Sequence, residues 1–150
     1  MLDTDQCDEC FHLQRGARKN GRSICNAFPE GIPFTILHWR YDHRNKYPGD
    51  QGITFEPRSE RASQFHNQVL ERKAMARVVP PRPLAEIIQE DARSVGMSES
   101  SIGIALEQLA EYEEGRVRRD RTEAAIDAAD LRARGVSEEE IQRLTRLDSV

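Results

Sequence analysis

Apolar residues recur at helical spacing from residue 59 onward. Between residues 59 and 79 they fall three or four positions apart, which is typical of an amphipathic helix. The run Pro80-Pro81-Arg82-Pro83 ends this pattern, because proline lacks the backbone N–H that a helix needs. We therefore expect a connecting helix over 59–79 and a stiff Pro-rich spacer over 80–83.

Two similar corners divide residues 84–150, namely Gly96-Met97-Ser98-Glu99 and Gly135-Val136-Ser137-Glu138. In each corner the glycine suits the left-handed end of one helix, and the serine can cap the next helix. Apolar stripes lie before, between and after the corners. The sequence therefore predicts four helices here: one from 84, one from 98 to about 112, a separate one that ends at 135, and a last one.

Residues 1–58 show no sustained helical period. Prolines on both sides of Gly31 make residues 28–33 a rigid turn that cannot be a central strand. Residues 34–39 are rich in β-branched and aromatic side chains and suit either a strand or a short helix, and residues 53–55 predict a short strand. The expected fold class is α+β, with a loop and short-strand N-terminal module before a mainly helical part.

The charge is distributed unevenly along the 150 residues. The formal net charge is −4, with charged residues at 32% and hydrophobic residues at 37%. Residues 1–58 are neutral, 59–83 carry a net +3 and 84–150 carry a net −7. We expect the two ends to have different partners, and we call 84–150 the acidic helical module.

No stretch approaches the roughly 18 apolar residues that span a bilayer, so we expect no membrane partner. The first residues are acidic, with no basic and apolar leader behind them. The predicted location is the cytoplasm, which would be the host cytoplasm or the virion for a phage-encoded protein.

All three cysteines lie in the N-terminal third. Cys7 and Cys10 are two residues apart, a spacing that lets one turn offer two thiolates to one metal ion, and Cys25 would be a third ligand. A histidine is the expected fourth ligand, and we favour His43 because it lies in a polar, turn-rich stretch. Thiolates with one imidazole suit zinc, so we predict a structural zinc site that staples a knob over 1–58. The alternatives are a redox pair or cysteines that only fill the core, and another histidine as fourth ligand.

The same third resembles a group of small, mostly uncharacterised bacterial and phage-associated proteins. Its residues are Cys-x2-Cys, then Cys25-Asn26-Ala27-Phe28-Pro29-Glu30-Gly31-Ile32-Pro33, then a His, then Gly49-Asp50-Gln51-Gly52-Ile53-Thr54-Phe55-Glu56. The resemblance covers about residues 7–57. It implies that Cys7, Cys10, Cys25 and His43 form one site, and it implies no activity.

Two basic clusters flank the cysteines. One lies in the predicted loop between Cys10 and Cys25, and the other mixes basic and aromatic side chains, namely Arg40, Arg44 and Lys46 with Trp39. Such a mixture suits phosphate contact and base stacking, although a solvated loop explains it as well. A helix-turn-helix at the first corner is disfavoured, because its second helix would present glutamates to phosphates.

The motifs of a zinc deaminase and of an HNH-type nuclease are incomplete, so we expect no enzyme. The sequence instead predicts a zinc-stabilised adaptor or structural protein, which would bind another protein within a bacterial or phage assembly. The alternative is a nucleic-acid-binding regulator.

Overall fold

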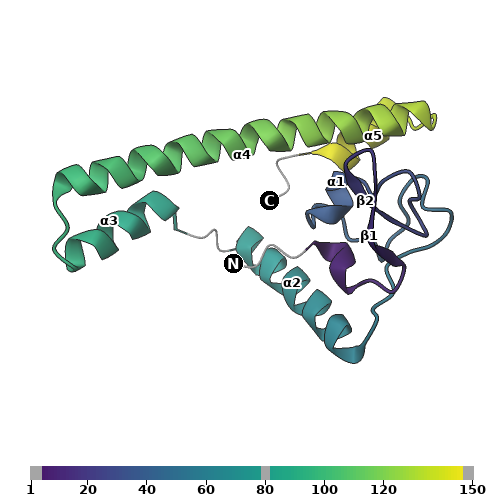
Figure 1. Cartoon of the computed structure of the whole chain (residues 1–150), viewed down its shortest axis with the longest axis horizontal. Coiled ribbons are helices and arrows are strands. Elements are labelled where there is room, and N and C mark those ends of the chain that lie inside the picture. Colours follow the sequence, from purple (N-terminus) through teal and green to yellow (C-terminus); the bar gives the residue numbers. More distant parts are fainter. Residues whose placement is uncertain (1–4, 79–81, 147–150) are drawn as a thin grey trace.

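The computed structural model describes residues 5–78 and 82–146 of the chain, and its class is α+β, as expected. A two-stranded sheet lies near the N-terminus and helices make up most of the rest (Figure 1). In chain order the elements are the 3-10 turn η1 (Gln6–Glu9), β1 (Leu13–Lys19), β2 (Arg22–Cys25), α1 (Phe34–Leu37), α2 (Glu60–Val78), α3 (Leu84–Ser94), α4 (Glu99–Ala133) and α5 (Glu138–Thr145).

The segment between Cys10 and Cys25 is a β-hairpin, so the prediction of a plain loop there was wrong. β1 and β2 pair antiparallel, with Lys19 opposite Arg22. Asn20 and Gly21 link them with φ angles of 53° and 76°. Asn-Gly is the dipeptide that a two-residue hairpin turn prefers, since both of its residues need positive φ.

Two further expectations in the N-terminal third have definite outcomes. Residues 34–37 form the short helix α1, one of the two structures predicted for that stretch. Residues 53–55 form no strand, contrary to expectation. Ile53 donates its backbone N–H to Asp50 and Phe55 donates to His43, at 2.9 and 2.8 Å. These hydrogen bonds go to loop residues, so no ladder forms.

Helix α4 is a single helix of 35 residues, where the sequence predicted two. Ser98 caps its start, accepting a hydrogen bond from the Ser101 N–H at 3.3 Å. Gly115 lies inside it with open space around its Cα, and the arginines that follow are good helix formers. The helix therefore continues for about 52 Å and runs along the length of the molecule (Figure 1).

The hydrophobic core joins both ends of the chain. Phe28, Ile32 and Ile36 from the N-terminal third are at most 1% exposed, and they form one cluster with Leu131 of α4 and Ile141 of α5. Figure 1 shows the end of α4 and α5 lying against the sheet and α1. We call this compact part, residues 5–58 with 123–145, the core module.

A buried carboxylate fastens α4 to α1. Asp127 is 1% exposed and accepts hydrogen bonds from the backbone N–H of Phe34 (3.0 Å), and from the N–H and hydroxyl of Thr35 (2.7 and 2.6 Å). Burial raises the pKa of Asp127, while the hydrogen bonds from Thr35 and Phe34 act in the opposite direction. The contact places the last quarter of α4 at the start of α1.

The rest of α4 leaves the core module and carries α3 alongside it. We call residues 84–114 the arm. Of its side chains only Ala92 and Ile102 are buried, where α3 folds back on α4. Helix α2 packs separately, against η1. Within the described residues no helix is both long and apolar enough to cross a membrane.

Candidate functional site

The three cysteines lie close together in the core module, and all three are buried with free thiols. Cys7 lies in η1, Cys10 follows it and Cys25 ends β2. Burial raises the pKa of Cys7 well above its ordinary value, and the neighbouring thiols of Cys25 and Cys10 raise it further. Burial also raises the pKa of Cys25. Cys7 therefore lies near enough to Cys10 and Cys25 for their charges to affect its pKa.

His43 lies in the same module, packed on Phe28 at 5.4 Å between ring centroids. Phe28 in turn exchanges backbone hydrogen bonds with Cys25. The Nε2 of His43 is buried without a hydrogen-bond partner, 3.9 Å from Asp50. Burial is also the main reason that the pKa of His43 is lowered, so its imidazole is neutral at pH 7.

His12 is a second histidine with an unsatisfied buried nitrogen, its Nδ1. Its Nε2 lies 3.1 Å from Glu56, and its backbone carbonyl accepts the N–H of Asn26, next to Cys25. A positive charge on His12 would also lower the pKa of His43. Two histidines of the core module therefore have a nitrogen lone pair or proton without a partner.

The predicted zinc staple is not seen in the structure. In residues 5–78 and 82–146, no group of three or more Cys, His, Asp or Glu side chains is arranged to hold a metal ion. The physical reason is that Cys7 and Cys25 pack in the hydrophobic cluster, as small apolar side chains do. The fold of the core module shown here rests on that packing.

The four predicted nucleic-acid contacts are divided between two places. Arg44 is held by Asp42, with guanidinium–carboxylate distances of 2.7 to 3.1 Å, and Lys46 is exposed nearby. Arg40 and Trp39 lie instead at the end of α1, facing α2 and α4. Two of the three cations among them are thus already paired with carboxylates, Arg44 with Asp42 and Arg40 with Asp120.

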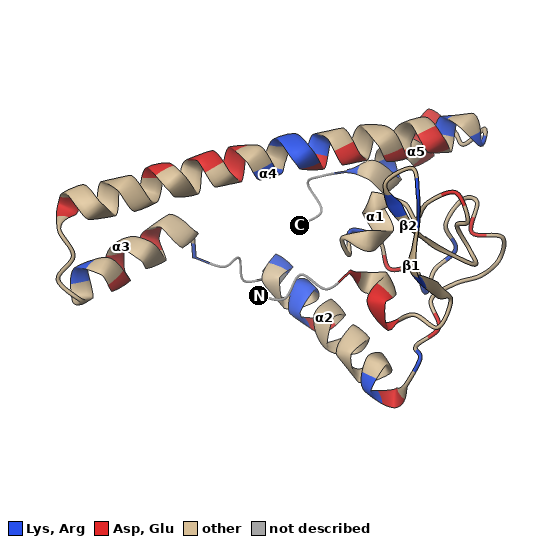
Figure 2. Cartoon of the chain, viewed as in Figure 1, with Lys and Arg blue, Asp and Glu red and all other residues tan. Residues whose placement is uncertain are grey.

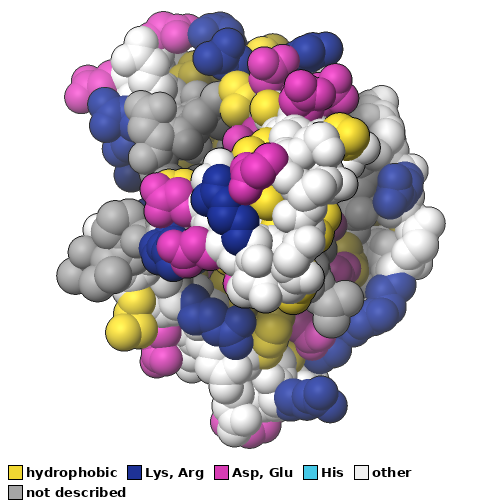
Figure 3. Space-filling model, turned by 90° about the vertical axis from the view of Figure 1, so that its left-hand side faces the viewer, with side chains coloured by type: hydrophobic (Ala, Val, Ile, Leu, Met, Phe, Trp, Pro, Cys, Tyr) yellow, Lys and Arg dark blue, Asp and Glu magenta, His cyan; other side chains and the backbone are white. Residues whose placement is uncertain are grey.

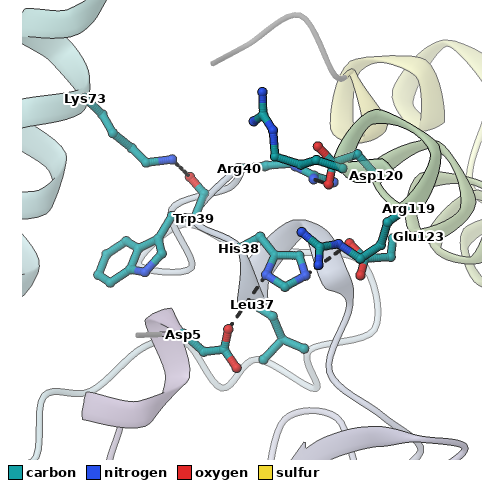
Figure 4. A pocket seen from close by; sticks show the side chains of 10 residues that line it. Asp5, Leu37, His38, Trp39, Arg40, Lys73, Arg119, Asp120 and Glu123 are labelled. Atoms are coloured by element: carbon teal, nitrogen blue, oxygen red, sulfur yellow. Dashed lines mark hydrogen bonds and ion pairs between the residues drawn. The ribbon is translucent and has the colours of Figure 1, made fainter. Parts of the chain in front are cut away.

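Arg40 and Trp39 line a cavity of about 410 Å³ between α1, α2 and α4 (Figure 4). The Arg40 guanidinium pairs with Asp120 of α4 at 2.8 Å. His38 lies between two carboxylates, at 3.0 Å from Glu123 and 3.7 Å from Asp5. Because these partners come from distant parts of the sequence, no local pattern predicted the cavity.

The arm exposes apolar side chains at its far end, where α3 turns into α4, and along α4 as far as Tyr112. Val95 is 75% exposed, Ile104 58% and Tyr112 64%. Figure 3 faces this end of the molecule and shows hydrophobic side chains between charged ones. The arm is also acidic, with eight Asp or Glu and a single Arg, whereas arginines follow directly in the middle of α4 (Figure 2).

No family model, no curated protein and no solved structure matches this chain. The resemblance over residues 7–57 therefore stays a prediction, and function has to be argued from the arm, the cysteine cluster and the cavity.

Proposed function

We propose that this protein is a non-enzymatic, zinc-stabilised adaptor or structural protein of a bacterial or phage assembly, in which the arm binds another protein. The observation that carries the proposal is the exposure of Val95, Ile104 and Tyr112 on the pair of helices that projects from the core module. Large apolar side chains gathered on one element are typical of interaction surfaces. Each would contribute about 1.5–3 kcal/mol on full burial.

The charge of the arm indicates the kind of partner. Arg93 pairs with Glu99 at 3.0 Å, and Arg82, just before the arm, pairs with Glu90 at 2.8 Å and with Glu86 at 3.7 Å. Among the described residues the other five carboxylates of the arm have no ion pair. Facing acidic surfaces repel one another, so that arm-to-arm contact between two copies is disfavoured. A basic partner with an apolar strip complements the arm in both respects.

The test is affinity purification of an arm variant in a bacterial host, with a matched control. Val95→Glu/Ile104→Glu places charges on the apolar patch, and Phe11→Glu makes the same change on the core module, where Phe11 is 67% exposed. We expect the wild type and Phe11→Glu to retain one stoichiometric protein that Val95→Glu/Ile104→Glu loses. Equal retention by all three proteins would contradict the proposal, as would the absence of any stoichiometric protein.

Zinc is the second part of the proposal. Three neighbouring thiols and two histidines with unsatisfied nitrogens supply the donor types that zinc takes, and zinc would add a tetrahedral cross-link to the core module. The thiols would have to leave their apolar packing and lose their protons. Because their pKa is raised, we expect affinity for zinc to increase with pH.

Zinc content measured by elemental mass spectrometry tests this part. We expect one equivalent in the wild type purified without chelator, and none in Cys25→Ala or His43→Ala. His12→Ala is the control variant, and it should keep the metal. Loss in His12→Ala but not in His43→Ala would reassign the fourth ligand, and a metal-free wild type would leave the cysteines as core residues.

The alternative function is a nucleic-acid-binding regulator, favoured by the position of Arg40 and Trp39 at a cavity with several cations. Salt-dependent binding of DNA or RNA that weakens in Arg40→Ala and Arg44→Ala would support it. Retention of a protein partner without such binding would support the adaptor.

A further inference from the structure

The cavity between α1, α2 and α4 holds more positive than negative side chains. Its carboxylates are Asp5, Asp120 and Glu123, and each has a basic partner in Arg40 or His38. Its remaining charged side chains are cations: Lys73 of α2, with Arg116 and Arg119 of α4. Within the described residues no carboxylate lies within ion-pair distance of these three cations.

Lys73 is placed where an anion would stabilise it. Its ammonium group is half-buried and donates a hydrogen bond to the Trp39 carbonyl at 2.7 Å (Figure 4). Burial lowers the pKa of Lys73, and the charges of Arg77 and Arg40 lower it further. A bound anion would counter both effects, because it supplies the opposite charge beside the half-buried ammonium group.

The backbone beside the cavity is strained. Trp39 has a φ of 59°, in the left-handed region that bulky residues rarely adopt. The Lys73 hydrogen bond to its carbonyl and the contacts of its ring with Phe65 and His66 hold this conformation. Strain of this kind gathers at ligand sites, where the surrounding structure fixes a geometry that the chain alone would avoid.

We propose that this cavity binds a phosphate group through Lys73, Arg116 and Arg119. Guanidinium groups match phosphate oxygens with paired hydrogen bonds, and an ammonium adds a point charge. A volume of about 410 Å³ admits a pyrophosphate or one phosphate of a nucleic-acid backbone with its neighbours. The phosphate chemistry is shared by these two sources, and the site is independent of the arm surface.

The experiment is isothermal titration calorimetry of the full chain with inorganic pyrophosphate and with a short single-stranded DNA oligonucleotide, at constant ionic strength. Trp39 is the only tryptophan of the chain, so its fluorescence gives a second readout at the cavity itself. The test variant is Arg116→Gln/Arg119→Gln. The control is Arg118→Gln/Arg121→Gln, which removes the same charge from a different face of α4.

We expect saturable binding of at least one probe with a change in Trp39 fluorescence. The affinity should fall about tenfold or more in Arg116→Gln/Arg119→Gln and stay within about twofold in the control. Pyrophosphate that binds and displaces the oligonucleotide would identify a small phosphate ligand, while saturation by the oligonucleotide alone would identify a nucleic-acid backbone. Equal weakening in both variants, or no saturable binding of either probe, would overturn the proposal.

Discussion

The core module and the arm belong to one chain but use their side chains in opposite ways. The core module hides its large apolar residues, so that Phe28, Ile32 and Leu131 are at most 2% exposed. The arm leaves residues of the same kind, such as Val95 and Ile104, more than half exposed. Apolar burial is therefore concentrated in the core module, whereas the arm keeps an exposed apolar surface.

Polar groups follow the same division. In the core module the fully buried Gln6 donates to the Tyr41 carbonyl at 2.8 Å and accepts the His43 N–H at 2.8 Å, which fixes the loop that follows α1. In the arm the ion pair of Arg93 and Glu99 is exposed to solvent. Buried hydrogen bonds specify a structure because breaking them leaves unsatisfied groups, whereas exposed ion pairs contribute little.

The largest effect is expected from Asp127→Ala. The change leaves two backbone N–H groups and the Thr35 hydroxyl without their acceptor, so we expect the free energy of unfolding to fall by about 3–5 kcal/mol. Urea denaturation measures it. Glu99→Ala in the arm is the control and should leave the unfolding midpoint unchanged. Similar losses of stability in both variants would contradict the difference between buried hydrogen bonds and exposed ion pairs.

The next largest effect is expected from truncating apolar side chains. It should lower the free energy of unfolding in the core module and leave it almost unchanged in the arm. Leu131→Ala opens a cavity in the core, and we expect a loss of about 2–5 kcal/mol in unfolding free energy. Ile104→Ala removes atoms that are already largely in water, and we expect a change within about 0.5 kcal/mol. The same urea titrations compare them, and a destabilising Ile104→Ala would mean that the arm surface is covered.

A smaller, pH-dependent effect is expected from His66, which is 2% exposed and packs on Phe55 at 4.1 Å between centroids. Burial lowers the pKa of His66, although Asp42 at 3.2 Å opposes the shift. The unfolded chain then binds a proton more readily than the folded chain, so stability falls as pH drops below about 6.5. His66→Leu should show a smaller loss between pH 7.5 and 5.5, and an identical loss would exclude this histidine as the cause.

Local signals explain what the sequence predicted correctly. Ser98 and Ser137 each cap a helix, and Gly96 and Gly135 end the preceding ones with φ of 76° and 77°. The hairpin also has a local signal, because Asn20 and Gly21 are the turn dipeptide that two-residue hairpins prefer. In contrast, α4 continues through Gly115 because the neighbouring residues favour a helix, which offsets the low helix propensity of glycine.

The site residues were harder to predict because their partners are distant in sequence. The spacing of the cysteines predicted metal ligands, and nothing local shows that Cys7 and Cys25 pack as core residues. Asp127 contacts Thr35 across 92 positions, and Lys73 meets Trp39 across 34. Such pairs are set by tertiary packing, which residue spacing alone does not encode.

Phe28 and Leu144 belong to the same core but lie far apart in the sequence. The core can therefore form only after most of the chain has been synthesised. A ribosome adding about 5–20 residues per second needs about 6–23 s to get from the first of these residues to the second. During that interval residues 84–114 are made and can pair as helices, while the thiols still lack the cover of α4 and α5. The surface that we assign to a partner is therefore synthesised before the core that carries it is complete.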